Sequence, residues 1–308
     1  MKTFHGSRNL PRHLQGGVVT LGVFDGVHLA HQVLLRRTVQ KATRRRRPAI
    51  AYTFHPHPAR VLAPMVNLSL LMTLEQRSEA MAAYKLDALV IERFTRSFSR
   101  TSARLFFQKL VRRLQPVTLL VGYDFTFGQK REGTVELLEQ LGKEYAVEIV
   151  IVSPLFARDC LISSTEIRNA VRSGEMRRAA LLLGRPFFID GTVVPGRRLG
   201  RTIGLHTANL RTPNEILPPL GVYATRTILG RKIYRSVTNI GHNPTFGGRT
   251  LSIETHLLDF SKNIYNRKIR LQFFDRLRDE KTFSDPDALR RQILRDGARA
   301  RKILRGQR

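Results

Sequence analysis

Two histidines beside a glycine-bearing turn could bind an anion. Residues 18–31 read VVTLGVFDGVHLAH, a β-branched apolar run followed by a Gly-Val-Phe-Asp-Gly turn and the start of a helical pattern. Unpaired backbone N–H groups and the helix dipole favour an anion at such a junction, and small residues let it approach. His28 and His31 add side-chain donors on the same surface. The pattern predicts a phosphate site, and therefore a nucleotide.

Three further segments carry polar side chains that suit the same ligand. Residues 53–58, TFHPHP, place two histidines in a loop made rigid by prolines. Residues 122–128 end an apolar run with an acid and aromatics, and residues 162–168 offer hydroxyls at a helix start beside an arginine, a second anion cradle. The candidate side chains of these segments are His55, His57, Asp124, Phe125, Arg131, Ser164, Thr165 and Arg168.

The second half of the chain carries a different set of candidates. Gly196 and Gly204 flank a basic turn, where glycine permits close backbone approach to phosphate. Thr207 and Asn209 are two residues apart, so on a strand they share one face, and their oxygens suit magnesium and a triphosphate. Glu254 interrupts an apolar strand, which is costly unless the acid is paired or functional. Taken alone, Glu254 could equally be a surface residue.

Alternating strand and helix patterns must position the first set. Apolar runs at 18–24, 49–54, 88–94, 118–125 and 147–152 predict buried strands, and patterns at 31–46, 73–84, 101–114 and 133–142 predict helices. This alternation predicts a mostly parallel sheet covered by helices. Ligands of such sheets bind beyond the carboxyl ends of the strands, where the turns at 22–31 and 122–133 fall.

The pattern changes after residue 155. Residues 162–186 predict two short helices, and short strands follow at 187–194, 203–210, 222–228, 233–238, 251–258 and 269–274, with a turn at 239–246 and a closing helix at 286–301. Evenly spaced short strands predict a small antiparallel β-barrel. We therefore expect two domains, residues 1–185 and 186–308.

These segments, in this order and spacing, resemble the bacterial bifunctional riboflavin kinase/FAD synthetase family from about residue 4 to residue 296. The family pattern Gly-x-Phe-Asp-Gly-x-His-x-Gly-His is met at Gly22, Phe24, Asp25, Gly26, His28 and His31, and the pattern Gly-x-Pro-Thr-Ala-Asn at Gly204, Thr207, Ala208 and Asn209. The chain departs from the family at Ala30 (usually Gly), His206 (usually Pro), Asn266 (usually Gly) and Thr134 (often Asp).

The resemblance implies a nucleotidyltransferase-like α/β domain that adenylylates FMN. In it, His28 and His31 would contact the ATP phosphates, with Gly22, Phe24, Asp25 and Gly26 in the same turn. Ser164, Thr165 and Arg168 would hold the leaving pyrophosphate. The flavin and nucleotide would lie against His55, His57, Asp124, Phe125 and Arg131.

The resemblance implies for the second half a riboflavin kinase-like barrel with a C-terminal helix. Glu254 would be the general base for the ribityl 5′-hydroxyl, Thr207 and Asn209 would ligate Mg²⁺ and ATP, and Gly196 and Gly204 would approach the ATP phosphates. The expected function is phosphorylation of riboflavin to FMN and adenylylation of FMN to FAD, with ATP and Mg²⁺ in both steps. Retention of one activity, with the kinase favoured, and an RNA-associating protein with relic sites are the alternatives.

The composition of the chain indicates which classes of partner and which cellular setting to expect. The net charge is +29, from 53 Lys and Arg against 24 Asp and Glu, which favours anionic partners. A general bias toward arginine and non-specific association with nucleic acid both account for the excess. Cys160 is the single cysteine, which excludes an intrachain disulfide and predicts a cytoplasmic setting. No apolar run is long enough to cross a bilayer, and the oligomeric state stays open.

Overall fold

The computed structural model describes residues 1–8, 10–196, 207–245, 248–281, 283 and 285–306. The chain divides into two compact units, Met1–Ser163 and Ser164–Arg308. Each unit is described by itself below. The division falls before the two short helices that the sequence prediction placed in the first domain.

The first unit is built on a six-stranded parallel sheet in the order β1-β4-β3-β2-β5-β6. Its strands are β1 (Lys2–His5), β2 (Val18–Leu21), β3 (Ala49–His55), β4 (Ala88–Arg93), β5 (Thr118–Gly122) and β6 (Glu148–Val152). The predicted parallel α/β fold is confirmed. Strand β1 was not predicted, because four residues with alternating polar side chains give too short a pattern.

Helices cover this sheet, and several of them begin at polar caps. The longer ones are α1 (Leu29–Arg45), α3 (Leu74–Ala82), α5 (Ala103–Leu114) and α6 (Val135–Glu144); shorter ones are η1 (Arg12–Leu14), α2 (Pro58–Leu62), α4 (Arg96–Ser99) and η2 (Gln129–Arg131). Thr73 and Gln76 form a capping box on α3. Thr134 accepts from Leu137 N at the start of α6, so this departure from the family keeps the cap. The hairpin of β7 (Phe156–Ala157) and β8 (Cys160–Leu161) ends the unit.

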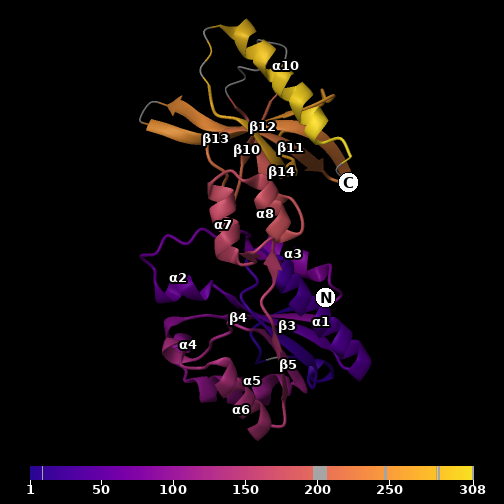
Figure 1. Ribbon diagram of the computed structural model, residues 1–308, viewed down its shortest axis with the longest axis vertical. Helices are drawn as coiled ribbons and strands as arrows, with labels where there is room; N and C mark the ends of the chain where they lie inside the picture. The colour runs from indigo at the N-terminus through magenta and orange to yellow at the C-terminus, as the bar shows by residue number, and fades with distance from the viewer. Residues whose placement is uncertain (9, 197–206, 246–247, 282, 284, 307–308) are drawn as a thin grey trace. The chain divides into compact units, whose positions relative to one another are not determined.

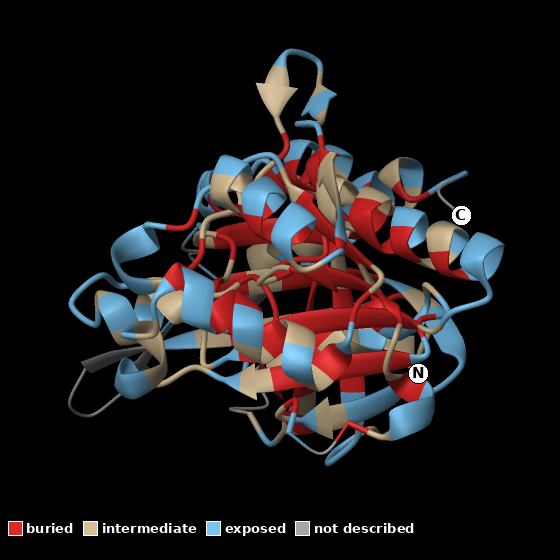
Figure 2. Cartoon of the chain, turned by 90° about the horizontal axis from the view of Figure 1, so that it is seen from below, coloured by how far each residue is buried: buried red, intermediate tan, exposed pale blue. Residues whose placement is uncertain are grey.

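Burial follows the predicted periods. The four inner strands β2, β3, β4 and β5 are buried along most of their length, whereas the edge strands β1 and β6 are mostly exposed or half-buried. The helices alternate buried and exposed positions, as Figure 2 shows. On one side the core contains an aromatic cluster in which Phe54 contacts Phe94, Phe98 and Phe106. This cluster lies under the carboxyl ends of β3 and β4, where the sequence predicts ligand binding.

The second unit is a closed antiparallel barrel preceded by two helices, α7 (Ser164–Arg172) and α8 (Met176–Leu183) (Figure 1). The strand order is β10-β13-β12-β11-β14-β9. Its strands are β9 (Phe187–Val194), β10 (Ala208–Arg211), β11 (Gly221–Leu229), β12 (Lys232–Thr245), β13 (Gly248–Leu257) and β14 (Lys268–Arg278). The predicted barrel and the closing helix, α10 (Pro286–Ile303), are confirmed.

The predicted turn at 239–246 is wrong. Residues 239–245 continue β12 and pair with β13 up to Thr245 opposite Gly248. Gly241 and Pro244 suggested a turn locally, but cross-strand pairing in the barrel outweighs those local preferences. The extended β12 pairs with β13 on both sides of Glu254, which is the seventh residue of β13.

A chain of hydroxyls crosses the barrel interior. Thr227 donates to Ser236 (2.9 Å), Ser236 and Thr225 share a hydrogen bond (2.8 Å), and Thr225 and Thr238 share another (2.7 Å). Thr238 donates to Thr255 (3.0 Å). All five side chains are fully buried. Such a network links β11, β12 and β13 through polar contacts that need one particular register.

Candidate active sites

The predicted phosphate turn lies between β2 and α1 and has an unusual backbone. Phe24, Gly26 and Val27 all have positive φ, and Val27 N donates to Phe24 O (3.1 Å). Only Gly26 adopts this region without strain, so the turn holds two L-residues there at a cost. His28 follows as the N-cap of α1, but its side chain makes no capping hydrogen bond. Its imidazole therefore does not serve the helix end.

His28 and His31 face each other across one turn of the helix. Their rings stack with centroids 3.6 Å apart and planes at 22°. Burial lowers the pKa of His31 well below its ordinary value, and the charges of His28 and Arg77 lower it further. His31 is thus neutral at physiological pH. Its buried Nδ1 has no hydrogen-bond partner among the described residues, which leaves a nitrogen for a ligand.

Phe24 and Asp25 support the turn from inside. The Phe24 ring is fully buried, lies over Gly22, where an added Cβ would come 3.0 Å from it, and meets the His31 ring edge-on. The Asp25 carboxylate is 3% exposed and accepts from Leu71 N (3.1 Å) and Met72 N (3.3 Å). These contacts fix the turn to the segment before α3.

Arg77 of α3 is a residue of this site that the sequence analysis missed. It is 6% exposed, and its guanidinium donates to Val23 O (2.5 Å) and Phe54 O (3.0 Å). Those carbonyls belong to the segments that carry His28 and His55. Burial lowers the pKa of Arg77, and the charge of Asp25 offsets part of that effect. No sequence signal marks Arg77, because its partners are 54 and 23 residues away.

The two histidines at the end of β3 have different environments. His55 is exposed, and partial burial, followed by the charges of Arg77, Arg60 and His5, lowers its pKa. His57 is the N-cap of α2, and its Nδ1 accepts from Ala59 N (3.1 Å). His57 thus has a structural task in the loop that the prediction assigned to ligand binding.

A cavity of about 260 Å³ opens beside this segment. Phe94, Phe98 and Phe106 contribute aromatic walls, and Arg100, Lys130 and Arg131 contribute cations; Leu62, Ser99, Thr101, Gly128 and Gln129 complete the lining. Of the predicted flavin-site residues, Arg131 lies in this lining, and Phe125 stacks on Phe127 (5.6 Å) nearby in sequence. Asp124 is exposed in the turn that follows β5. Phe94 and Phe98, which follow the end of β4 four residues apart, were the sequence signal that could have predicted this aromatic cavity.

Ser164, Thr165 and Arg168 belong to the second unit. They lie in the first two turns of α7. Thr165 is exposed, whereas Arg168 is buried, with 7% of its surface exposed. Ile167, Ala170 and Val171 form the apolar face of this helix. The predicted pyrophosphate contacts of these residues stay predictions.

The barrel places Asn209 and Glu254 directly opposite each other on paired strands β10 and β13. Asn239 of β12 lies opposite Glu254 on its other side. Cross-strand partners share a face with Cβ atoms roughly 5 Å apart, so an amide flanks the carboxylate on each side. All three side chains are half-buried. Asn239 is a second residue that the sequence analysis missed, because it fell in the mispredicted turn.

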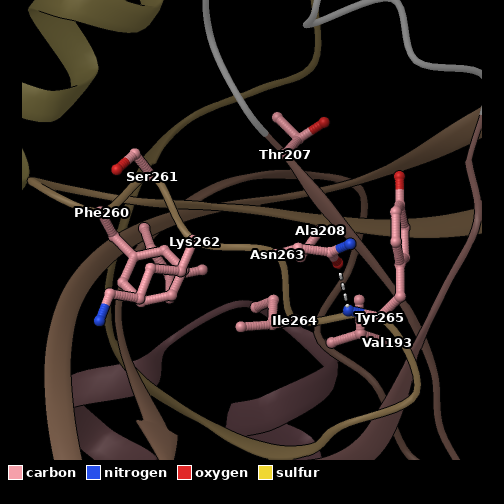
Figure 3. Close-up of a pocket in the computed structure, with 10 residues that line it drawn as sticks. Val193, Thr207, Ala208, Phe260, Ser261, Lys262, Asn263, Ile264 and Tyr265 are labelled. Atoms are coloured by element: carbon pink, nitrogen blue, oxygen red, sulfur yellow. Dashed lines mark hydrogen bonds between the residues drawn. The ribbon is translucent and has the colours of Figure 1, made fainter.

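Thr207 and Asn209 line different cavities. Thr207 borders one of about 270 Å³ with Phe260, Lys262, Asn263 and Tyr265, in which Asn263 accepts from Tyr265 N (2.9 Å) (Figure 3). The remaining lining is Val193, Ala208, Leu257, Ser261 and Ile264. In Figure 3, the Thr207 hydroxyl and the Tyr265 ring stand at the same end of this cavity.

Asn209 borders a second, larger cavity of about 540 Å³ together with Pro195, Gly196, Thr212 and Ser252. A Cβ added to Gly196 would come 2.0 Å from Asn209 Nδ2. Gly196 thus leaves the space that the Asn209 amide occupies. Gly204 and His206 lie outside the described residues.

The departure at Asn266 has a simple structural reading. Its φ is +61°, in the left-handed region where the family's glycine is strain-free and where asparagine is the best tolerated alternative. The bend after the Tyr265 cavity is therefore kept.

The donor sets fit a magnesium ion held mainly by substrate. Among the described residues, no group of three or more His, Cys, Asp or Glu side chains could hold a metal. Mg²⁺ is commonly bound by one or two protein oxygens together with substrate phosphates. The Thr207 hydroxyl, the Asn209 carbonyl and the Glu254 carboxylate supply such oxygens around β10.

A parallel α/β unit with two stacked histidines at the start of α1, followed by a barrel with an acid between two amides, is the arrangement expected of a phosphoryl- and nucleotidyl-transfer enzyme. Two family models match the chain: FAD synthetase over residues 10–166 and riboflavin kinase over residues 183–304. The chain belongs to the bifunctional riboflavin kinase/FMN adenylyltransferase family.

Curated relatives carry that name over nearly their whole length. The Haemophilus influenzae protein is 37% identical over 96% of this chain and 97% of its own, and the Escherichia coli K12 protein is 37% identical over 99% and 98%. The Bacillus subtilis protein is 34% identical over 96% of each. The family and enzyme class predicted from the sequence are confirmed, and nothing in these comparisons favours the one-activity or RNA-associating alternatives.

A solved structure supports the fold of the whole chain. A Streptococcus pneumoniae protein described as a macrolide-efflux protein is 31% identical, with a TM-score of 0.89 over 98% of this chain and 99% of that one. Within the described part of the present chain, no helix has the length and apolarity to span a membrane.

Proposed function

We propose that this chain runs both reactions of its family, phosphorylating riboflavin in the barrel and adenylylating FMN at the β2–α1 turn. The observation that carries the kinase assignment is the Asn209–Glu254–Asn239 row across three strands. A carboxylate held between two amides is oriented and remains able to accept a proton. The stacked His28–His31 pair carries the adenylyltransferase assignment.

In the kinase reaction, Glu254 accepts the proton of the ribityl 5′-hydroxyl. The oxygen attacks the γ-phosphorus of ATP in line, FMN forms, and ADP leaves. Asn239 and Asn209 hold the carboxylate, and the Asn209 carbonyl is available to the metal. The nucleotide or flavin enters the cavities beside Thr207 and Gly196.

Magnesium would be held at Thr207 and Asn209, and when bound it neutralises phosphate charge and orients the transferred group. Gly196 supports this role because its missing side chain leaves the Asn209 amide in place. The same clearance lets the backbone of residues 195–196 approach a phosphate.

In the adenylyltransferase reaction, a phosphate oxygen of FMN attacks the α-phosphorus of ATP and pyrophosphate leaves. No strong base is needed, because the nucleophile is already an anion. His31 is neutral, so it donates an N–H to a phosphate oxygen rather than supplying a full charge. His28 completes the pair, while Phe24, Asp25 and Gly22 hold the turn that aims both rings.

The flavin of FMN would occupy the aromatic cavity of the first unit. Phe94, Phe98 and Phe106 offer ring faces and edges for an isoalloxazine, and Arg100 and Lys130 offer charge for its phosphate. Leu62 lies on the rim and is 58% exposed, with Met65 95% exposed just beyond. An apolar side chain so placed would be covered by a bound ring.

Because the two reactions share one chain, each serves as the control for the other. Glu254→Gln should lower the rate of riboflavin phosphorylation by about a hundredfold or more and leave the conversion of supplied FMN to FAD unchanged. His28→Ala with His31→Ala should do the reverse. Products are resolved by chromatography after incubation with ATP and Mg²⁺.

Two results would overturn these assignments. Full kinase activity in Glu254→Gln would remove its role as the base. Loss of both activities in either variant, with thermal unfolding unchanged, would show that the sites are not independent. Arg168→Lys, which keeps the charge but removes the bidentate fork, tests the predicted pyrophosphate contact separately. The cytoplasmic setting stays a prediction that rests on the single cysteine.

A further inference from the structure

The exposed face of helix α10 carries a line of cations that neither reaction uses. Residues 286–305 hold seven Lys or Arg residues and two Asp residues. Arg291, Arg295 and Lys302 are exposed and recur at spacings of 4 and 7, which places them on one side of the helix. Arg305, in the turn that follows the helix, is exposed three residues further on. We call these four residues the α10 stripe. At 1.5 Å per residue its helical part, from Arg291 to Lys302, extends over about 17 Å.

The two acids of this helix leave most of the stripe without a partner. Asp296 is 4% exposed and is bound to Arg278 (2.8 Å). Asp287 is exposed in the first turn, four residues before Arg291 and on the same side, and offsets at most the charge at that end. Other cations of the helix are engaged: Arg301 pairs with Asp259 (2.7 Å), and Arg299 donates to Leu277 O (2.7 Å). Within the described ranges, no hydrogen bond or ion pair involves the four stripe side chains.

Two arrangements near this helix set like charges against each other. Arg291 and Arg295 are i and i+4 on the helix, a spacing at which like charges destabilise it. Arg226 and Arg235 are directly opposite each other on β11 and β12, again unfavourable without an anion. The Arg226 guanidinium lies 4.9 Å from the centre of the Phe274 ring, and Phe274 belongs to the apolar cluster that buries Ala300 and Leu304 of α10. The second pair thus lies near the C-terminal end of the helix.

We infer that the α10 stripe, extended by Arg226 and Arg235, binds the phosphodiester backbone of RNA without sequence preference. A linear row of guanidinium forks suits successive phosphates, which arginine can bind in a bidentate manner. A bilayer suits the surface less well, because the apolar face of α10 is already packed on the barrel through Ala300 and Leu304. This binding is a property additional to the two transfer reactions.

Cations near a helix C-terminus also stabilise its dipole, which is the simplest other account of Lys302 and Arg305. The test therefore changes the mid-helix residues. Arg291→Gln with Arg295→Gln removes a repulsive pair, so the barrel should remain folded. Arg37→Gln with Arg44→Gln on α1 is the matched control: both arginines are exposed, no contact of theirs is described, and the same charge is lost.

The experiment measures fluorescence anisotropy of a labelled single-stranded oligouridylate of about 20 nucleotides. The full chain is used with FAD and ADP present to fill both active sites. The wild type should bind with an affinity that falls steeply with salt. The stripe variant should bind about tenfold more weakly at low salt, with the slope of log K against log salt reduced by about 1.4, or 0.7 for each lost contact. The control variant should change little.

Three results would overturn the inference. Equal weakening by the stripe and control variants would mean that net charge alone is responsible. Absence of salt-dependent RNA binding by the wild type would remove the partner. Binding to vesicles of phosphatidylglycerol and phosphatidylcholine, with none to RNA, would assign the stripe to membranes. Riboflavin phosphorylation and FMN adenylylation should be unchanged in both variants, so the result is separable from the proposed catalytic roles.

Discussion

Asn209 lies directly opposite Glu254 in the pairing of β10 with β13. The proposed metal ligand and the proposed base are thus held in register by two backbones rather than by a loop. Their relative position depends on barrel pairing, so it should survive changes in surrounding loops and respond sharply to changes in either side chain.

Asn209→Asp places a second carboxylate beside Glu254. The added charge should raise the pKa of Glu254, because two like charges at this separation resist ionisation together. The acid limb of the pH–rate profile for riboflavin phosphorylation should move upward by about one pH unit. The profile for FMN adenylylation in the same variant should not move. An unmoved kinase profile would contradict the placement of Glu254 as the titrating base.

Gly196→Ala should impair the kinase through Asn209. The new methyl would come 2.0 Å from Asn209 Nδ2, so the amide must leave its position. Riboflavin phosphorylation should fall by about tenfold or more. The matched control is Gly297→Ala in α10, where the nearest atom is 3.5 Å away and alanine should stabilise the helix by up to about 1 kcal/mol. Equal kinase rates in the two variants would argue against a functional Asn209 amide.

Arg77→Lys should affect FMN adenylylation and spare the kinase. A single ammonium cannot reach both Val23 O and Phe54 O in the geometry of the guanidinium fork. One carbonyl would lose its donor, at a cost of about 1–3 kcal/mol in the free energy of unfolding. The adenylylation rate should fall by about ten- to a hundredfold as the two histidine-bearing segments separate.

A purely structural role for Arg77 would lower stability without that rate change when activity is measured well below the melting temperature. Arg93→Lys, an exposed arginine on β4, is the control. We expect it to leave both readouts unchanged.

The sequence predicted the strands and turns that carry each site better than the residues that hold those elements together. Apolar runs and glycine turns identified the strands and the His28–His31 turn, because these patterns are local. Arg77 and Asn239 were missed for opposite reasons. Arg77 acts on carbonyls 54 and 23 residues away, and Asn239 lies in a strand whose glycine and proline resemble a turn. Asp25 was expected at the phosphate, yet its carboxylate accepts from Leu71 and Met72, a long-range contact that spacing alone does not reveal.

Stability of the first unit should depend on the protonation of His31. Its pKa is lowered in the fold by burial first and then by His28 and Arg77. The unfolded chain therefore binds a proton more readily, and the free energy of unfolding should decrease as pH falls through the ordinary histidine pKa of about 6.5. The contribution is fully present above that pH. Calorimetry between about pH 7.5 and pH 5 measures it.

His31→Asn should flatten this pH dependence. The exposed His13→Asn serves as the matched control, and it should leave the slope close to that of the wild type. A slope that is the same in His31→Asn and wild type would show that another group is responsible.

Thr238→Val tests the hydroxyl chain inside the barrel. Valine matches threonine in shape but removes the hydrogen bonds of Thr238 to Thr225 and to Thr255, so the free energy of unfolding should fall by about 1–3 kcal/mol. Ser252→Ala removes one long hydrogen bond to Gly241 O (3.4 Å) from a half-buried side chain. This change should lower the free energy of unfolding by much less than Thr238→Val does. Chemical denaturation, followed by a signal from the barrel, measures the free energy of unfolding of both variants. Equal costs would indicate that the buried network contributes no more than a surface bond.

The two sheets differ in one respect that bears on solubility. The barrel closes on itself through the pairing of β9 with both β10 and β14, so its closed part has no open edge. The parallel sheet ends in β1 and β6, whose outer edges remain open to a foreign strand. At β6 this opening is guarded by Glu148, which holds Lys41 and Arg45 (both 2.6 Å) and so surrounds the edge with charge. Self-association during folding or storage should therefore begin at the parallel sheet, and neutral replacements of these three residues should hasten it.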